Sequence, residues 1–226
     1  MAEKRSAAQF FPPSCDLDDL HAGHAEGCGL GALRDASRQC QGCDLYVRAT
    51  QTVFGEGDAH ARLLLVGEVP GDAEDVAGHP FVGPAGRLLD DVLEEAGILR
   101  PAVWVTNAVK HFKYEQRGTK RIHKKPTAVE VQACRPWLDA EIEIVEPEVV
   151  VAMGATAAQS LLGRDFRITH HRGEWAPGDA LTNRRRSRVM ATWHPSAVLR
   201  TPEREDRHRM RAELLADLRE VAKALT

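Results

Sequence analysis

Three short segments carry side chains suited to acid–base or hydrogen-bonding chemistry, and each directly follows an apolar run. They are Gly67-Glu68-Val69-Pro70-Gly71, Asn107 and His194-Pro195-Ser196. An unpaired carboxylate near a protein core is costly, so packing explains Glu68 poorly. Beside a reacting group, the same carboxylate can act as an acid, a base or an electrostatic stabiliser. The first segment on its own also fits an ordinary turn between a strand and a helix.

The side chains of Asn107 and His194 are suited to holding a heterocyclic base. The amide of Asn107 offers an acceptor and a donor side by side, which complements the N3–H and O4 edge of uracil; cytosine presents the reverse pattern. A histidine donor such as His194 can stabilise negative charge on a departing group. Phe81, in the stretch 78–83, can provide a stacking surface. Taken singly, these residues also fit a turn cap, a histidine bonded to backbone and a core aromatic.

The elements that must position these residues follow an alternating pattern. Four apolar runs, each short enough to be a buried strand, are separated by stretches with helical spacing. The runs are 62–66, 103–106, 149–153 and 188–192, and the helical stretches are 88–96, 127–145, 155–162 and 205–225. This alternation predicts an α/β fold, a three-layer α/β/α domain with a central, mainly parallel four-stranded sheet. The three chemical segments then meet at the carboxyl ends of the strands.

A chain of 226 residues is long enough for one packed core, and we expect one domain over residues 35–226. Residues 1–34 lack periodicity, which predicts a flexible tail. No apolar stretch approaches the ~20 residues that span a bilayer, and the N-terminus lacks the apolar core of a signal peptide. We therefore expect a monomeric, cytoplasmic protein that does not contact membranes.

The formal net charge of -3 excludes a generally basic nucleic-acid-binding protein, but it allows local basic patches. Two such runs are present: Arg117, Lys120, Arg121, Lys124 and Lys125 in one, and Arg184, Arg185, Arg186 and Arg188 in the other. Each run fits either phosphate binding or a solvated loop.

Four motifs occur in a fixed order along the chain: GEVPG at 67–71, PFVGPAGRLLD at 80–90, Asn107 at a strand end, and HPS at 194–196. In this order they resemble the uracil-DNA glycosylase superfamily, particularly its iron-sulfur branch, over roughly residues 38–222. The resemblance implies excision of uracil from DNA, with single strands favoured because base flipping costs least there. It assigns uracil binding to Gly67, Phe81, Asn107 and His194, and catalysis to Glu68 and His194.

A narrower resemblance lies in the segment Gly118-Thr119-Lys120-Arg121-Ile122-His123-Lys124, which is similar to the KRRIH loop of the UdgX subgroup. It implies that His123 attacks the sugar C1′ after uracil leaves and forms a covalent protein–DNA adduct. Two departures weaken this likeness. Val69 stands where the subgroup usually has Gln, and Thr119-Lys120-Arg121 stands where it usually has Lys-Arg-Arg.

Two alternatives to covalent capture therefore stay open. The first is a multiple-turnover iron-sulfur glycosylase that releases an abasic site. The second is a non-catalytic module that binds single-stranded DNA. The resemblance also implies a set of DNA contacts: Lys120, Arg121, Lys124, Ser196, Leu199 and Arg200, with Val198 beside Leu199 in the loop that wedges into the space left by the base.

Five cysteines in a chain without an export signal favour metal ligation or plain thiols over a disulfide framework. Cys40 and Cys43 have the spacing of a ligand pair, which fits zinc, an iron-sulfur cluster or neither. The resemblance adds Cys134 and His111, where the ordinary branch has cysteine, and so implies a structural [4Fe-4S] cluster on these four residues. Zinc is the rival metal, and a separate zinc site on Cys15, His21, His24 and Cys28 is a further alternative.

Overall fold

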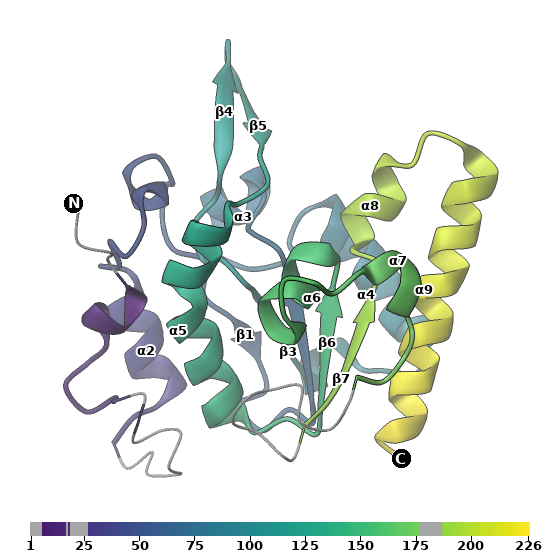
Figure 1. Cartoon of the computed structure of the whole chain (residues 1–226), viewed down its shortest axis with the longest axis horizontal. Helices are drawn as coiled ribbons and strands as arrows, with labels where there is room; N and C mark the ends of the chain where they lie inside the picture. The colour runs from purple at the N-terminus through teal and green to yellow at the C-terminus, as the bar shows by residue number, and fades with distance from the viewer. Residues whose placement is uncertain (1–5, 17, 19–26, 177–186) are drawn as a thin grey trace.

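The computed structural model describes residues 6–16, 18, 27–176 and 187–226, and shows a sheet between two layers of helices (Figure 1). The strand order is β1-β3-β2-β6-β7. The strands are β1 (Glu56–Gly57), β2 (Leu63–Gly67), β3 (Val103–Asn107), β6 (Val149–Met153) and β7 (Arg188–Thr192). The four longer strands are parallel and match the predicted runs. The sheet has a fifth strand, because the two residues of β1 pair antiparallel with β3 and are too few to produce a pattern in the sequence.

Successive strand residues point into two different apolar clusters. Leu63 and Leu65 pack with α4 (Pro84–Glu95) and α9 (Arg204–Ala224) on one face of the sheet. Leu64 and Val66 pack with α5 (Ala128–Val145) and α6 (Ala155–Leu162) on the other. In Figure 1, α6 lies in front of the sheet and α4 behind it. Because both faces are covered, the parallel strands are apolar throughout.

The ends of the two central helices follow from local sequence. Thr127 accepts a hydrogen bond from the backbone of Glu130, and the Glu130 carboxylate accepts one from the backbone of Thr127, which forms a capping box before α5. After α4, Gly97 adopts a φ of 78°, and the amide of Ile98 donates to the carbonyl of Leu93. This turn requires the left-handed conformation that glycine tolerates best. Both predicted boundaries are confirmed.

Smaller elements surround this frame. They are η1 (Ala7–Phe10), α2 (Leu30–Ser37), η2 (Asp44–Val47), α3 (Asp72–Ala77), η3 (Arg100–Ala102), β4 (Tyr114–Arg117), β5 (Lys120–His123), α7 (Ile168–His171) and α8 (Pro195–Arg200). Strands β4 and β5 pair antiparallel as a hairpin that projects from the sheet (Figure 1). The basic loop expected from the sequence therefore has a regular structure of its own.

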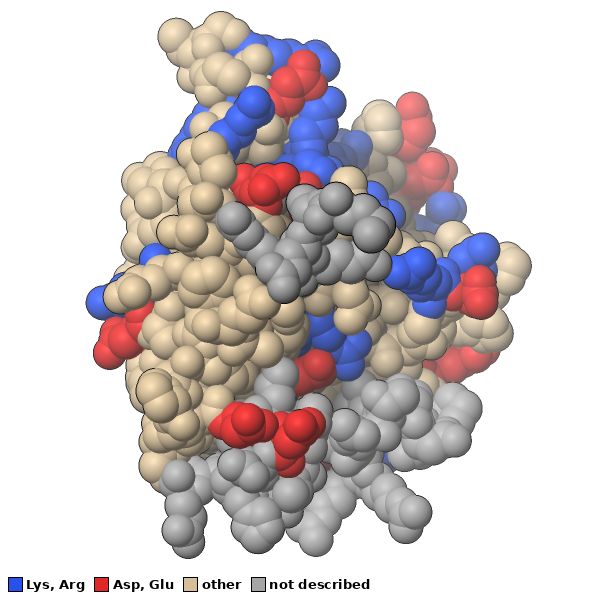
Figure 2. Space-filling model, turned by 60° about the vertical axis from the view of Figure 1, so that its left-hand side comes forward, with Lys and Arg blue, Asp and Glu red and all other residues tan. Residues whose placement is uncertain are grey.

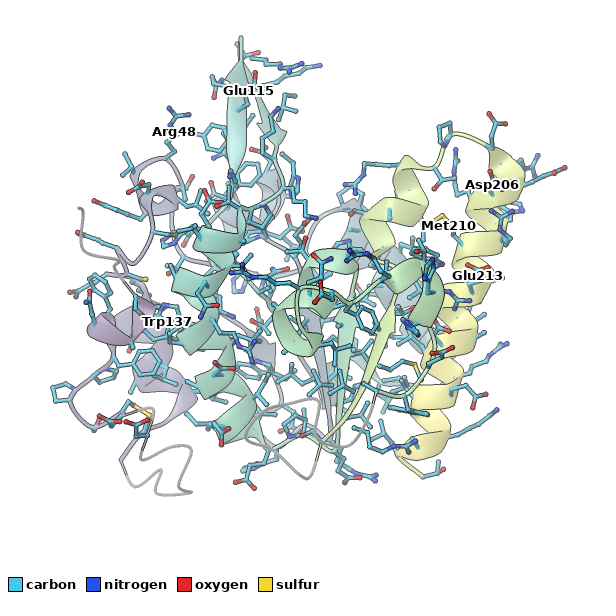
Figure 3. All side chains as sticks on the ribbon, viewed as in Figure 1. Arg48, Glu115, Trp137, Asp206, Met210 and Glu213 are labelled. Carbon is cyan, nitrogen blue, oxygen red and sulfur yellow. A yellow bond between two sulfur atoms is a disulfide. The ribbon has the colours of Figure 1, made fainter. Side chains whose placement is uncertain are left out.

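The described part of residues 1–34 packs against the domain, whereas the sequence predicts a flexible tail there. Ala7 and Leu33 are fully buried, and the ring of Phe11 lies 4.5 Å from that of Trp137 on α5. Trp137 points from α5 toward this N-terminal segment (Figure 3). The physical reason is apolar burial by side chains that are too widely spaced to form a periodic pattern.

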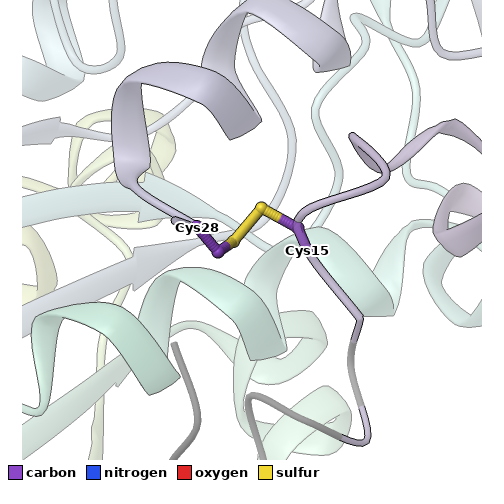
Figure 4. Close-up of a disulfide and its surroundings, with 2 residues drawn as sticks. All are labelled: Cys15 and Cys28. Carbon is purple, nitrogen blue, oxygen red and sulfur yellow. A yellow bond between two sulfur atoms is a disulfide. The ribbon is translucent and has the colours of Figure 1, made fainter. Parts of the chain in front are cut away.

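Cys15 and Cys28 form a disulfide (Figure 4). This corrects the expectation of metal ligands or plain thiols for these two residues. It also removes the alternative of a second zinc site, because disulfide sulfurs are not thiolate ligands. The other two residues of that alternative, His21 and His24, lie outside the described residues, as do Arg184, Arg185 and Arg186 of the second basic run.

No helix within the described ranges combines the length and apolar character that crossing a bilayer requires.

A buried ion pair lies between the sheet and α5. The ammonium of Lys110 contacts the carboxylate of Glu141, and both side chains are inaccessible to solvent. Lys110 also donates to Thr106 Oγ1 at 2.6 Å and to the carbonyl of Asn107 at 2.9 Å. Glu141 accepts from the Thr106 hydroxyl and, at 2.8 Å, from the backbone of Gly55. Each charge is thus satisfied by several polar partners, as burial requires.

We expect Glu141→Gln to lower the free energy of unfolding by about 3–5 kcal/mol, because it leaves the Lys110 charge buried without a counter-ion. Denaturant titration measures this change, and the double variant Lys110→Met/Glu141→Gln should lose less. The matched control is Glu148→Gln, which removes the partner of Arg62 in a pair whose side chains are more than half exposed. It should leave the unfolding midpoint almost unchanged. Equal losses for Glu141→Gln and Glu148→Gln would contradict the prediction.

Candidate active site

A cavity of about 410 Å³ opens where β2 and β3 end. Its walls come from the turn after β2, the stretch before α4, the end of β3, the hairpin and the start of α8. The lining residues are Val69, Pro70, Gly71, Asp72, Ala73, Glu74, Phe81, Gly83, Pro84, Ala85, Asn107, His123, His194, Ser196, Leu199 and Arg200. One space is therefore lined by residues that the sequence singles out and that lie up to 119 positions apart: Phe81, Asn107, His123, His194, Ser196, Leu199 and Arg200.

The floor of the cavity depends on close contact between Gly67, Asn107 and Phe81. A Cβ atom at Gly67 would lie 2.2 Å from Asn107 Oδ1 and 2.7 Å from Phe81 Cζ. Both distances are far below van der Waals contact, so only glycine lets these two side chains approach the end of β2. Asn107 is 3% exposed. Its amide is thus held in one place beside the aromatic ring.

Phe81 has a φ of 59°, which is unusual for a residue with a bulky side chain. Its carbonyl packs against Gly86, where a Cβ atom would approach that oxygen to 1.5 Å. The Phe81 ring lies 5.8 Å from the ring of His194, and the two planes are 25° apart. Backbone strain of this kind is found at functional sites. Here it turns an aromatic ring toward the cavity.

His194 is the N-cap of α8, and its hydrogen bonds define its tautomer. Nδ1 accepts a hydrogen bond from the backbone of Ser196 at 3.1 Å, and the Ser196 hydroxyl lies 2.8 Å from the same nitrogen. A nitrogen that accepts from a backbone N–H carries no proton, so the neutral imidazole is protonated on Nε2. Burial, followed by the charges of Arg200 and His123, lowers the pKa of His194 to about 4. His194 is therefore a neutral donor in the cavity wall.

Glu68 is fixed by a contact that the sequence did not indicate. The hydroxyl of Thr156, near the start of α6, donates to Glu68 Oε1. The charge of Glu68 also acts on the His123 imidazole, which places the carboxylate near the cavity although it is not part of the wall. A second carboxylate, Glu74, is buried and accepts from the backbone of Gly83 at 3.2 Å. Glu74 joins the turn after β2 to the stretch before α4.

His123 is the last residue of β5, and it lines the cavity. Burial within this wall is the main cause that lowers its pKa. The carboxylates of Glu68 and Glu74 raise the pKa, while Arg200 lowers it. The net result is a neutral imidazole at neutral pH, with a nitrogen lone pair available for bonding.

Arg121 anchors the hairpin to α3, whereas the sequence predicts a DNA contact for it. Its guanidinium lies 2.6 Å from the fully buried Asp75 carboxylate and 2.5 Å from that of Asp72. It also lies 5.3 Å from the ring centres of both Phe112 and Tyr114. With its donors engaged in this way, Arg121 positions His123 two residues further along β5.

Of the other predicted DNA contacts, Ser196, Leu199 and Arg200 line the cavity, whereas Lys120 and Lys124 do not. Lys120 is exposed on the hairpin, and Lys124 pairs with Glu115 at 2.6 Å. Glu115 lies on the projecting hairpin (Figure 3), and Figure 2 shows Lys and Arg side chains gathered there with acidic atoms among them. Leu199 is 42% exposed at the mouth. Val198, in contrast, is 1% exposed and packs in the core, so the expectation that it wedges into DNA is wrong for this residue.

Three cysteines from two distant segments, Cys40 and Cys43 in one and Cys134 in the other, lie near one another. The charges of Cys40 and Cys43 both act on Cys134, and burial raises the pKa of Cys134 and raises that of Cys43 to about 11. Cys40 Sγ accepts from the Trp137 indole at 3.3 Å, and Cys134 Sγ accepts from the backbone of Lys110 at 3.2 Å. All three are free thiols. Sulfurs that accept such hydrogen bonds are suited to thiolate ligation.

His111 is buried, and burial lowers its pKa to about 4, so that it is a neutral imidazole. Its backbone pairs with Thr52, whose hydroxyl lies 3.4 Å from Ser37 Oγ. The Ser37 carbonyl in turn accepts from the backbone of Cys40. His111 and Cys40 thus belong to adjoining segments. Among the described residues, however, no three His, Cys, Asp or Glu side chains converge as a ready metal-binding group.

Comparison with known proteins extends these observations. Residues 54–219 match the model of the family described as the uracil DNA glycosylase superfamily. A type-4 uracil-DNA glycosylase of Thermotoga maritima is 41% identical over 172 residues, which are 74% of this chain and 82% of the relative. Enzymes of the same name from Pyrobaculum aerophilum and Archaeoglobus fulgidus are 35% and 34% identical, covering 76% and 77% of this chain and 86% of each relative.

We expect His194 to stay neutral and protonated on Nε2 between pH 8 and pH 5, because its pKa lies near 4. Long-range 15N–1H correlation spectra of 15N-histidine-labelled protein report the tautomer and the titration directly, and His194→Gln identifies the signal. Ser196→Ala keeps the backbone donor to Nδ1 and should preserve the tautomer. A titration midpoint near the unperturbed value of 6.5, or a proton on Nδ1, would show that the assignment is wrong.

Proposed function

Because the chain belongs to the uracil-DNA glycosylase superfamily, we propose that it cleaves the bond between uracil and deoxyribose in DNA. The observation that carries this proposal is the convergence of Phe81, Asn107 and His194 on one cavity, with Gly67 packed against the first two. The N3–H and O4 edge of uracil that Asn107 would contact faces the opposite base in a duplex, so the target nucleotide must leave its stack. The expectation from the sequence favours single strands as the substrate, since they require least unstacking.

Asn107 selects uracil in this proposal. Its carbonyl oxygen accepts from uracil N3–H while its amide nitrogen donates to O4. Cytosine would place a donor against the amide nitrogen and an acceptor against the oxygen, leaving both groups unpaired. Because Asn107 is buried, those unpaired groups would be costly. Phe81 provides the surface on which the base stacks.

Bond cleavage places negative charge on the base and positive charge on the sugar. His194 donates a hydrogen bond from Nε2 to uracil O2, where the negative charge develops. Its neutral form already carries the proton on Nε2, so its protonation state need not change. Glu68, held by Thr156, stabilises the oxocarbenium-like sugar. Uracil leaves with the electron pair of the broken C1′–N1 bond and takes a proton from solvent.

The second step decides between capture and turnover. We propose that His123 captures the sugar: one imidazole nitrogen gives its lone pair to C1′, and the proton on the other nitrogen passes to Glu68 or to solvent. The position of His123 on the cavity wall, its neutral state and the anchoring of the hairpin through Arg121 support this step. If water reaches C1′ first, the product is an abasic site and the enzyme turns over.

Val69 is the feature that favours turnover. It is buried and lines the cavity, so that position offers no polar side chain to the sugar or to His123. The similarity to type-4 uracil-DNA glycosylases also fits turnover. A non-catalytic module that binds single-stranded DNA is the remaining alternative.

Intact-mass analysis of the protein mixed with a uracil oligonucleotide separates the three functions. We expect a species with the mass of protein plus oligonucleotide minus uracil. His123→Ala should abolish this species and release abasic product, while His194→Ala should slow excision by roughly 10²–10³-fold. If the wild type forms more abasic product than there is protein and forms no adduct, the proposal of capture is wrong and the protein is a multiple-turnover enzyme. If the masses of the protein and of the oligonucleotide are both unchanged, the non-catalytic module that binds single-stranded DNA is the remaining alternative.

We propose that Cys40, Cys43, Cys134 and His111 hold a [4Fe-4S] cluster. The donor set fits this group, since three neighbouring thiols are unpaired by disulfides, two sulfurs already accept N–H donors, and His111 is neutral. Imidazole ligation of iron-sulfur centres is chemically established. When bound, the cluster would supply a covalent link between the N-terminal segment, the chain after β3 and α5. Its role in this proposal is structural.

Purified protein should contain about four iron atoms and matching sulfide per chain, with a broad visible absorption. Cys43→Ser should lose this absorption and lower the unfolding temperature. Cys15→Ser, which breaks the disulfide only, serves as the matched control and should retain the iron. Zinc without iron or sulfide in the wild-type protein would refute the cluster.

A further inference from the structure

A second cavity lies on the same face of the sheet as α5 and α6, and it extends between these two helices. Its volume is also about 410 Å³. The lining residues are Lys125, Pro126, Ala128, Val131, Gln132, Arg135, Thr156, Gln159, Ser160, Gly163 and Arg164, which we call the α5–α6 groove.

The α5–α6 groove adjoins residues of the proposed active site at two points. Thr156, which lines the groove, donates its hydroxyl to Glu68. Lys125, which also lines the groove, follows His123 by two residues as the chain leaves the hairpin. A strand whose uracil occupies the first cavity can therefore pass between the hairpin and the start of α6 into the groove.

The charge of the groove has one sign. Three cations line it, and no Asp or Glu does so among the described residues. Arg135 is engaged: it donates to the Ser160 carbonyl on α6 and lies 2.6 Å from Asp139, so it fixes the spacing of the two helices. Lys125 and Arg164 form no ion pair with any residue in the described part of the chain, and both are exposed. Two cations thus face solvent without a protein counter-charge.

We infer that the α5–α6 groove binds the single-stranded DNA adjacent to the uracil, on one side of it, through phosphate contacts to Lys125 and Arg164. This inference rests on the proposed function and names the path of the substrate strand. Unpaired cations along a groove are the electrostatic feature that tracks a nucleic-acid backbone. The lining has no aromatic ring, so binding there depends on phosphate and not on base identity. The exposed amide of Gln132 adds a polar contact along the same path.

Fluorescence anisotropy with oligonucleotides of equal length tests the groove. The probes carry uracil near the 5′ end, near the 3′ end or at the centre, and are compared for the wild type and for Lys125→Gln/Arg164→Gln. We expect the double variant to lose about tenfold in affinity for the central probe and for one end-placed probe only. Its salt slope should fall by about 1.4, because each single-stranded phosphate contact contributes about 0.7.

The matched control is Arg219→Gln/Lys223→Gln, which removes the same charge from the end of α9, next to a different cavity. It should change neither affinity nor salt slope by a comparable amount. Equal losses on both end-placed probes, or equal losses in the control, would overturn the inference, because general electrostatics would then explain the effect. Unchanged affinity in the groove variant would overturn it as well.

Different outcomes would refute the proposed function and the proposed role of the groove. If wild-type protein excises no uracil at saturating DNA, the proposed function is wrong whatever the binding data show. If the wild type excises uracil and the groove variant binds like the wild type, only the groove is refuted. In the expected result, the single-turnover excision rate of the groove variant at saturating DNA equals that of the wild type, because neither substituted residue contacts the base.

Discussion

The close approach of Asn107 and Phe81 to the backbone of Gly67 is the constraint on which the site depends. Strands β2 and β3 are neighbours in the sheet, and their registers place Gly67 opposite Asn107. A side chain at Gly67 would displace both the amide and the ring. In the proposed function, the sheet therefore sets the distance between Asn107, which reads the edge of the base, and Phe81, which stacks on its face. Specificity would then follow from sheet geometry together with the absence of a side chain at Gly67.

The electrostatics of the cavity are arranged around two neutral histidines. Burial lowers the pKa of both His123 and His194, and the charge of Arg200 acts on each in the same direction. Glu68 and Glu74 oppose this effect at His123 only. The two imidazoles can therefore perform different tasks: His194 can donate a hydrogen bond from Nε2–H, whereas His123 can offer a lone pair. Their environments separate roles that the residue type alone does not distinguish.

How much of this could be predicted depends on the range of the interactions involved. The parallel strands were predictable because burial on both faces makes each a continuous apolar run, and Thr127 marked the start of α5 through a local hydrogen-bond pattern. The hairpin of β4 and β5 was not predictable, because its polar strands lack the alternation of apolar and polar residues that burial of one face produces. The spacing of the cysteines in the sequence does not show that Cys15 and Cys28 form a disulfide.

Contacts between distant elements were the least predictable. The sequence singles out Glu68 but gives no sign of Thr156, because their meeting depends on how α6 packs beside β2. Arg121 resembles its basic neighbours in the sequence, yet the carboxylates of Asp72 and Asp75 on α3 engage it. A run of like charges thus divides into one residue that holds the hairpin and others that face solvent. Only the fold makes that distinction.

The buried pair of Lys110 and Glu141 connects these arguments. Burying two charges stabilises a fold no better than apolar residues of similar size, so stability alone does not account for them. Lys110 donates to the carbonyl of Asn107, and Thr106, the residue before Asn107, bonds to both charges. The pair therefore fixes the backbone at the end of β3, where a small shift would move the Asn107 amide, the group that selects uracil in the proposed function. Its contribution is the position of that amide.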